Sequence, residues 1–356
     1  MSTESNVQDP EPVSPPRSRR TLIIGVAALV LAVIAAAAVF LLRKEDEGTA
    51  FPAFTPFTYS GHGDAVLTVG WSPDGMRIAS GGWDKSVHIY DSTGNREVIE
   101  CARMPMQVRS LAWSPDSTRV ALADFDGNMN ICDAATGKTT AAVVAETSTF
   151  AVTAVDWSPD GAQLVVGAAP DARVLILDAA TLQQFQVYTG HAGYIQAVAW
   201  SPDGEQIASS DSRGSSKDTQ LHIWTAADAS KRGVEYRTDN SVDAMAWSPD
   251  SARLAANSGR DNGIQIIDIA TRQVERTYTV TAGEVFALAW SPDGEFIAAA
   301  DSAGPVVVHR PSGEKVFTFT GHPNRTRAVD WAPDSSYVAS ADGEDDTVQV
   351  WRVVIG

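Results

Sequence analysis

Cysteine is nearly absent from this chain. Only Cys101 and Cys132 occur among its 356 residues, too few for a disulfide framework even in an oxidising compartment, or for a zinc site of clustered Cys and His side chains. We therefore expect both to be free structural thiols. Phosphate-binding loops and dinucleotide-binding fingerprints are missing as well, so we expect no cofactor.

Basic side chains are scarce beyond a short N-terminal segment. The first 44 residues hold five of the 27 basic and three of the 44 acidic side chains, which leaves 22 basic and 41 acidic ones, a net charge of about −19, beyond them. A domain this acidic is repelled by nucleic acid and by anionic membrane surfaces. The composition therefore disfavours a nucleic-acid partner.

Long uncharged runs are also rare, and one segment, 21–42, is the exception with 22 residues. A helix of this length crosses roughly 30 Å of hydrocarbon. A cleaved signal peptide usually has a shorter apolar stretch, although the alanines at 35–38 keep that alternative open. We predict a transmembrane helix over 21–42, after a tail over 1–20 and before a linker over 43–54.

Basic residues on either side of this segment indicate its orientation. Three arginines, at 17, 19 and 20, precede it, and Arg43 and Lys44 follow it. Cytoplasmic flanks carry the excess of Lys and Arg, and the short polar N-terminus needs no translocation. We therefore expect a single-pass protein of the cell membrane, with a cytoplasmic N-terminus and everything after residue 42 outside the cytoplasm.

A five-residue phrase recurs seven times along the rest of the chain. It reads WSPDG, WSPDS or WAPDS and begins at Trp71, Trp113, Trp157, Trp200, Trp247, Trp290 and Trp331. Successive copies are 42, 44, 43, 47, 43 and 41 residues apart. This period fits one four-stranded propeller blade per repeat, and seven blades can close into a ring. We predict an all-β, seven-bladed β-propeller over 55–356.

Each repeat divides into strands and turns. An alternating segment such as 66–71 predicts an inner strand a, and the S-P-D-G that follows predicts a tight turn. A small-residue segment such as 78–81 predicts strand b, and a β-rich one such as 87–91 predicts strand c. Similar segments before strand a, such as 57–61 and 317–321, predict the outer strand d of the preceding blade.

The order of these strands predicts how the ring closes. The repeats begin with a strand d that has no blade of its own, and they end after a strand c that lacks its outer neighbour. We predict that residues 55–60 pair with residues 347–354, because this pairing covers two exposed strand edges.

The repeats resemble WD repeats over about residues 55–356, in their period, three Gly-His pairs, a turn Asp and Trp on strand c. The resemblance implies hydrogen-bonded sets of His, Ser, Asp and Trp. Their members are His62, Ser80 and Asp84 in blade 1, with Tyr90 in place of Trp; His191, Ser209, Asp218 and Trp224 in blade 4; and His322, Ser340, Asp345 and Trp351 in blade 7. Blades 2, 3, 5 and 6 lack Gly-His, so we expect them to be held more by packing than by polar networks.

The same phrase, WSPDG, also resembles the repeats of bacterial periplasmic Tol-type propellers and of propellers attached to prolyl peptidases. All these resemblances imply a propeller. The six histidines occupy positions that recur around the ring, and side chains spread in this way do not converge on one substrate. We therefore expect no catalytic residue and no enzymatic activity.

One acidic segment suggests calcium binding at first sight. Asp124, Asp126, Asn128 and Asn130 alternate around Gly127, as oxygen ligands do in calcium loops. No Glu follows at the spacing of a twelve-residue calcium loop, and Asp126 already has a turn position. We expect no metal site.

The WD-repeat resemblance also implies a binding face. Partner contacts in that family come from the residue before the turn Asp and from positions four and six residues before the repeat Trp. The candidates here are Trp83, Phe125, Leu67, Arg109, Tyr194, Lys217, Arg260, Phe286, Arg325 and Arg327. Aromatic and Arg side chains dominate binding hot spots, so we expect a protein partner that is acidic or carries apolar anchors.

The sequence as a whole predicts a membrane-anchored interaction platform or scaffold. Two alternatives stay open: an envelope-stability component similar to the Tol-type propellers, and a propeller that binds a small ligand or catalyses a reaction in its central channel. An enzyme should place several polar residues outside the repeat pattern at one end of several strands a. In the arrangement that the WD-repeat resemblance implies, strand d starts at the face with the S-P-D-G turns, so we expect that face to lie nearest the membrane.

Overall fold

The structure is a computed structural model that describes residues 54–94, 98–101, 103–144, 151–212, 219–231, 233–238, 242–257, 263–280 and 283–355. The predicted tail, the predicted transmembrane segment 21–42 and all of the linker except residue 54 lie outside these residues. Within them, no helix is long and apolar enough to cross a membrane.

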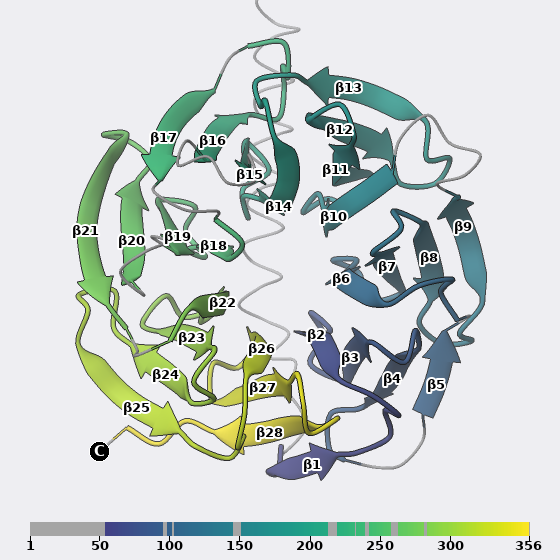
Figure 1. The fold of residues 1–356 in the computed structure, drawn as a ribbon, viewed down its shortest axis with the longest axis vertical. Coiled ribbons are helices and arrows are strands. Elements are labelled where there is room, and N and C mark those ends of the chain that lie inside the picture. The colour runs from purple at the N-terminus through teal and green to yellow at the C-terminus, as the bar shows by residue number, and fades with distance from the viewer. Residues whose placement is uncertain are drawn as a thin grey trace, which may run out of the picture. The chain divides into compact units, whose positions relative to one another are not determined.

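Seven four-stranded antiparallel sheets follow one another as the blades of a ring (Figure 1). Blade 1 contains β2 (Val66–Trp71), β3 (Arg77–Gly82), β4 (Val87–Asp91) and β5 (Val98–Cys101). Blade 2 contains β6 (Val108–Trp113), β7 (Arg119–Asp124), β8 (Met129–Asp133) and β9 (Thr139–Val143). Blade 3 contains β10 (Ala151–Trp157), β11 (Gln163–Ala169), β12 (Arg173–Asp178) and β13 (Gln184–Tyr188).

The remaining four blades repeat this pattern. Blade 4 contains β14 (Tyr194–Trp200), β15 (Gln206–Ser212), β16 (Thr219–Thr225) and β17 (Val234–Thr238). Blade 5 contains β18 (Met245–Trp247), β19 (Arg253–Asn257), β20 (Gly263–Asp268) and β21 (Gln273–Thr279). Blade 6 contains β22 (Val285–Trp290), β23 (Ile297–Asp301), β24 (Val306–His309) and β25 (Lys315–Phe319), and blade 7 contains β26 (Thr326–Trp331), β27 (Tyr337–Asp342), β28 (Val348–Arg352) and β1 (Phe57–Tyr59). The predicted seven-bladed, all-β propeller is confirmed.

The ring closes through β1, as predicted. Phe57 to Tyr59 pair with Val350 to Val348 in antiparallel register, a shorter ladder than the predicted one. Phe54, just before β1, is buried and packs edge-on against Trp71 of blade 1 and Tyr337 of blade 7, with ring centroids 5.0 and 5.5 Å apart. The Tyr337 hydroxyl also donates a hydrogen bond to the Phe54 carbonyl over 2.8 Å. The N-terminal end of the propeller thus ties its last blade to its first.

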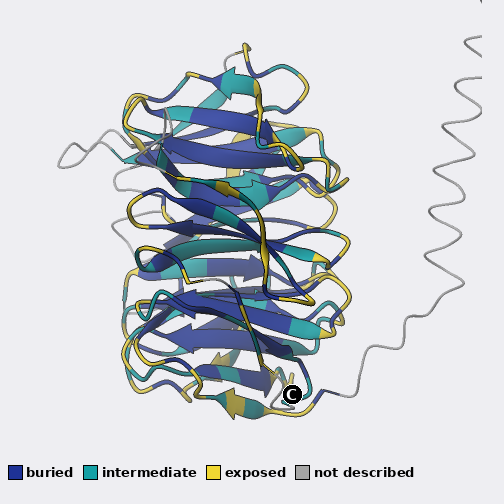
Figure 2. Cartoon of the chain, turned by 90° about the vertical axis from the view of Figure 1, so that its right-hand side faces the viewer, coloured by how far each residue is buried: buried dark blue, intermediate teal, exposed yellow. Residues whose placement is uncertain are grey.

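The hydrophobic core lies between neighbouring blades. Met129 and Ile131 of blade 2, for example, pack in one cluster with Leu164 and Val166 of blade 3. Neighbouring blades cover the faces of each sheet, so second strands such as β11 and β23 are almost fully buried, whereas outer strands such as β21 and the turns are largely exposed (Figure 2). The small side chains of strand b, such as the three alanines at 298–300, are fully buried and let adjacent sheets approach.

The repeated phrase joins one blade to the next. In blade 3, the indole nitrogen of Trp157 donates to the carbonyl of Ala112 in β6 of blade 2, over 3.0 Å. Trp113, Trp247 and Trp331 donate in the same way to the inner strand before them. The Ser and Asp that follow close the turn, as where the Ser158 hydroxyl donates to Asp160 over 2.6 Å.

The two cysteines form a disulfide, so the expectation of free thiols is wrong. Cys101 ends β5, the outer strand of blade 1, and Cys132 lies on β8, the third strand of blade 2; both side chains are buried. Their Cα atoms are 6.0 Å apart although 31 residues separate them in sequence. Counting cysteines does not show this, because the outer strand of one blade meets the third strand of the next only in the folded ring.

Candidate functional site

A β-bulge near the start of the inner strand recurs around the ring. In six blades the register between strands a and b shifts at one residue. A bulge leaves one residue unpaired and re-aims its side chain. The residues at these shifts are Leu67, Arg109, Thr153, Gln196, Phe286 and Arg327.

Blade 5 has Asp243 at the equivalent position, four residues before Trp247 and ahead of the short strand β18. Together with the six bulge residues it forms what we call the bulge ring. All seven members line one cavity of about 360 Å³. This cavity shares Ser110, Asp243 and Phe286 with the wall of the central channel, a space of about 520 Å³ between the inner strands. The bulge ring therefore surrounds one mouth of the channel.

This mouth lies on the face that carries the turns between strands b and c. The Trp83 amide in such a turn donates to the carbonyl of Ala65, just before β2, over 2.9 Å, and Phe125 donates likewise to Gln107 over 3.0 Å. These bonds hold each b–c turn beside the start of its own inner strand. The S-P-D-G turns follow the far ends of the inner strands and lie on the opposite face.

Two arginines of the bulge ring stack on aromatic rings. The guanidinium carbon of Arg327 lies 4.1 Å from the centre of the Phe286 ring, and that of Arg109 lies 5.4 Å from the Phe125 ring. Among the described residues, neither guanidinium forms an ion pair, whereas neighbouring Arg325 lies 3.8 Å from Glu344. Stacking on a ring face keeps the N–H groups at the guanidinium edge available for a ligand.

Burial disfavours the charge on both arginines. It lowers the pKa of Arg109, with Asp243 acting in the opposite direction. Burial also lowers the pKa of Arg327; nearby Arg325 lowers it further, and Glu284 and Glu344 act against this. Both side chains still carry a full charge at neutral pH, because arginine does not deprotonate in proteins. The mouth thus holds two cations that have lost part of their hydration.

The predicted residues of the binding face, as far as the structure describes them, lie in or around this mouth. Leu67, Arg109, Phe125, Phe286 and Arg327 line the cavity itself. Outside its lining, Trp83 and Tyr194 expose 51% and 59% of their surface, so that they are available to a partner, and Arg325 is exposed as well. Lys217 and Arg260 lie outside the described residues. Sequence reasoning passed over Thr153, although its place four residues before Trp157 is the signal that identifies it.

The structure brings together the described members of the polar sets that the WD-repeat resemblance implies. In blade 1, His62 contacts the Ser80 hydroxyl through Nε2 at 2.8 Å and Asp84 through Nδ1 at 2.9 Å. In blade 4, the Ser209 hydroxyl lies 2.7 Å from His191 Nε2 and accepts the Trp224 indole N–H over 3.0 Å; Asp218 lies outside the described residues.

Hydrogen bonds, rather than burial, set the ionisation of Asp84. Burial alone would raise the pKa of this carboxyl, but donors at the Gly63 and Ser86 backbones, the Ser86 side chain and His62 outweigh it and lower the pKa to about 2. The ionised Asp84 carboxylate therefore holds the loop before β2 against the b–c turn. A pKa this low indicates a structural role for Asp84 rather than acid–base chemistry near neutral pH.

A second set of buried carboxylates was not predicted. They are Asp124, Asp211, Asp301 and Asp342, which lie at or next to the end of strand b in blades 2, 4, 6 and 7 and are fully buried. Asp124, for example, accepts backbone N–H groups from Met106, Asp126 and Asn128 at 2.9 to 3.1 Å. Blades 2 and 6 thus have local polar contacts of their own at Asp124 and Asp301, beside the packing expected to hold them. The same bonds give Asp124 a turn-forming role in place of the calcium role considered for it.

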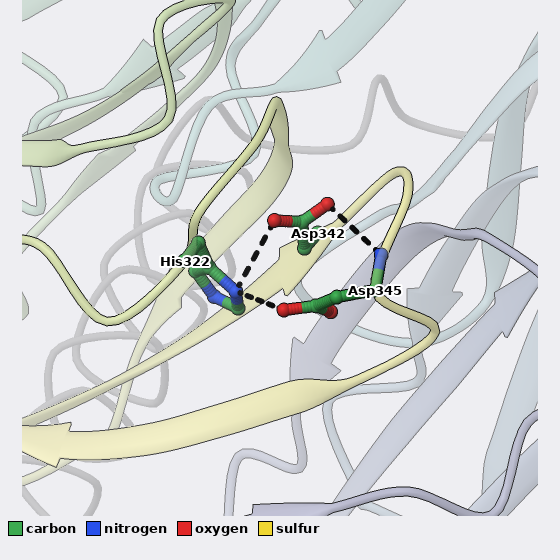
Figure 3. A group of neighbouring side chains, drawn as sticks. All are labelled: His322, Asp342 and Asp345. Carbon is green, nitrogen blue, oxygen red and sulfur yellow. Dashed lines mark hydrogen bonds and ion pairs between the residues drawn. The ribbon is translucent and has the colours of Figure 1, made fainter.

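Blade 7 contains the one group of three metal-ligand side chains that lie close together among the described residues: His322, Asp342 and Asp345 (Figure 3). Nδ1 of His322 is 3.4 Å from Asp345 and 3.7 Å from Asp342. Asp342 also accepts the backbone N–H groups of Asn324, Glu344 and Asp345. His322 Nε2 and the Trp351 indole both contact the Ser340 hydroxyl, at 2.8 and 2.9 Å. The cluster is explained by these internal bonds.

Histidines also lie between blades rather than along the channel. His88 stacks on His62 with centroids 4.3 Å apart and contacts the Tyr59 hydroxyl at 2.8 Å. His222 repeats this arrangement with His191 and Tyr188. The cavity at the channel mouth is lined instead by guanidinium, carboxyl, amide, hydroxyl and apolar groups. Such a set can bind an anion or a peptide by hydrogen bonds and stacking.

Comparison with known families agrees with this architecture. The WD40 family model, described as WD domain, G-beta repeat, matches residues 55–91, 140–178, 182–225, 272–304 and 313–352. These segments cover more than half of the chain, so the chain belongs to the WD40 repeat family. Blades 2 and 5 fall largely outside the matches and are recognised from the structure. A search of curated proteins found no significant match.

Proposed function

We propose that this protein is a non-enzymatic interaction platform that binds a protein partner at the face with the channel mouth. WD40 propellers commonly mediate protein–protein interaction. The observation that carries the proposal is the bulge ring. The repeats share one phrase at the end of the inner strand, but the residue type four positions before the repeat Trp varies from blade to blade, and the seven side chains at this position surround one cavity. Exposed Trp83 and Tyr194 extend the same face with large aromatic surfaces of the kind found in hot spots.

We further propose that the propeller is anchored in the cell membrane and lies outside the cytoplasm. The uncharged run over 21–42 and its basic flanks favour this topology. The disulfide between Cys101 and Cys132 is an independent argument, because disulfides persist in oxidising compartments. A linker of twelve residues, 43–54, spans at most about 40 Å. The face with the S-P-D-G turns would then lie nearest the bilayer, and the channel mouth would point away.

Small-ligand binding in the channel is a second candidate. Polar bulge-ring residues come from five different blades at one end of the inner strands, which is the arrangement that we expect of a ligand-binding propeller. A cavity of about 360 Å³ is also within the range of small-molecule sites. The resemblance of the WSPDG phrase to Tol-type propellers keeps a role in envelope stability as a further alternative.

Affinity capture after cross-linking in cells tests the interaction role. We expect the Trp83→Ala, Tyr194→Ala variant to lose at least about tenfold in partner yield, equivalent to about 1.4 kcal/mol, with an unchanged melting temperature. The matched control is Met76→Ala, Phe185→Ala, which removes equally exposed apolar side chains away from the channel mouth. Wild-type yields from the first variant, or equal losses from both, would show that this face is not the binding surface.

A further inference from the structure

We propose that the bulge ring recognises carboxylate groups of an acidic segment in the partner, through Arg109 and Arg327. This inference rests on the proposed interaction role and specifies the chemistry of its central contact. Arg109 belongs to blade 2 and Arg327 to blade 7, and they flank Leu67 of blade 1, which lies between these blades in the ring.

The first argument is electrostatic. Both guanidiniums are partly buried, and burial acts against their charge. Neither has an ion-pair partner in the part of the chain that the structure describes, whereas Arg253 and Arg310, elsewhere on the propeller, lie 3.4 and 3.3 Å from Glu275 and Glu295. The carboxylates that act on them, Asp243 on Arg109 and Glu284 and Glu344 on Arg327, form no contact ion pair with either guanidinium. A partly desolvated cation that lacks a contact ion pair is stabilised when an anion binds directly to it.

The second argument is geometric. The Arg327 guanidinium lies over the Phe286 ring and the Arg109 guanidinium over the Phe125 ring, at 4.1 and 5.4 Å from the ring centres, so each aromatic ring supports one guanidinium at the cavity. A planar guanidinium edge matches the two oxygens of a carboxylate and forms two parallel hydrogen bonds with them. Leu67 in the same cavity offers apolar surface to the methylene groups of a Glu side chain.

The choice of a carboxylate over other anions follows from the rest of the cavity. Asp243 lines it as well, and a fixed negative charge opposes a phosphate dianion more strongly than a single carboxylate. Beyond residue 44 the chain carries about −19, which repels nucleic acid and other polyanions over long range. Gln196 and Thr153 add neutral polar groups that suit peptide amides.

Fluorescence anisotropy with the purified full-length chain tests this inference. The probe is a capped, fluorescein-labelled peptide with two adjacent glutamates between glycines, and the matched peptide has two glutamines. At about 0.15 M salt, where long-range repulsion is screened, we expect saturable binding of the glutamate peptide with half-saturation below about 1 mM. The glutamine peptide should bind at least about tenfold more weakly.

A pair of charge-matched variants assigns the binding to the bulge ring. Arg109→Gln, Arg327→Gln should weaken binding of the glutamate peptide by at least about tenfold. Arg253→Gln, Arg310→Gln removes the same charge from exposed ion pairs and should leave binding unchanged. Circular dichroism and melting curves identify a variant that fails to fold, and for such a variant Arg→Lys at both positions replaces Arg→Gln, because Lys keeps the charge but loses the planar, two-pronged contact.

Several results would overturn the carboxylate assignment. They are no saturable binding of the glutamate peptide, equal binding of both peptides, equal losses in the two variants, or stronger competition by inorganic phosphate or a phosphoserine peptide than by the glutamate peptide. The interaction role is judged separately, because cellular capture uses Trp83 and Tyr194 and not the two arginines. Retained dependence on Trp83 without glutamate binding would reject this inference and leave the proposed function in place.

Discussion

At the scale of single residues, two carboxyl groups in the channel have an unusual position. Asp156 and Asp330 each precede a repeat Trp, where the other blades have Gly or Ala. Each carboxylate accepts the backbone N–H of the repeat Trp that follows it and the backbone N–H of the repeat Trp in the next blade. Asp330, for example, accepts the N–H of Trp331 over 2.9 Å and that of Trp71 over 2.7 Å. Burial raises the pKa of Asp156 to about 6 and that of Asp330 to about 7, although these hydrogen bonds favour the charged form.

These shifts predict how stability depends on pH. In the unfolded chain both groups lose their proton near a pKa of 3.8, whereas the folded state keeps them protonated up to about pH 6 and 7. The folded state therefore binds more protons between these values, and its stability falls as pH rises through that window. We expect urea midpoints of the wild type to fall between about pH 4 and 7 more steeply than those of Asp156→Asn, Asp330→Asn, and to level off above this window.

Only the slope is diagnostic in this experiment. Asn accepts one N–H group well and meets the second with its own NH₂ group, so the substitution has a stability cost of its own, and because Asn does not titrate this cost does not depend on pH. Loss of hydration lowers the pKa of buried His62 and of partly buried His88. In both proteins these histidines therefore have the opposite effect on the pH dependence of stability, below about pH 6.5. Parallel curves for variant and wild type would refute the assignment to these two carboxyls.

At the scale of strands, the disulfide fixes the outer strand of blade 1 to the third strand of blade 2. It closes a loop of 31 residues, and cross-links of this kind typically stabilise a fold by about 2 to 4 kcal/mol. We expect reduction of the wild type, or Cys101→Ser, Cys132→Ser, to lower the free energy of unfolding by about this amount. Denaturant titration with and without dithiothreitol measures the difference.

The serine variant is also the control for this prediction. Dithiothreitol should leave its unfolding midpoint unchanged, because no other cysteine is present. A wild-type protein whose midpoint is equally insensitive to reductant would contradict the disulfide contribution.

The sequence predicts the strands and turns of each blade better than it predicts the contacts between blades. The recurring phrase and its period specify one blade per repeat, because side-chain alternation and turn chemistry are local. The positions four residues before each repeat Trp could be identified from the WD-repeat resemblance, but the bulges that turn these side chains to one cavity could not. The disulfide and the bridging by Asp330 depend on which blade follows which in the closed ring. No local pattern encodes that information.

At the scale of the whole molecule, closure depends on few contacts. Three residues of β1 complete blade 7, and Phe54 fills the junction between Trp71 and Tyr337. We expect Phe54→Ala to lower the free energy of unfolding by roughly 3 kcal/mol, as for other buried Phe side chains. Calorimetry or denaturant titration measures it, with Phe185→Ala as the control because Phe185 is 64% exposed. Equal effects of the two variants would show that Phe54 does not secure the ring.

The pairing of β1 with β28 also sets an order of events during synthesis. About 290 residues separate the two strands, and at roughly 5 to 20 residues per second the ribosome needs on the order of 15 to 60 s to make them. During that time β1 has no partner, and the face of blade 1 that will meet Ala339 and Val350 of blade 7 stays uncovered. An apolar sheet face open for so long is a binding site for chaperones and a route to misassembly between nascent chains.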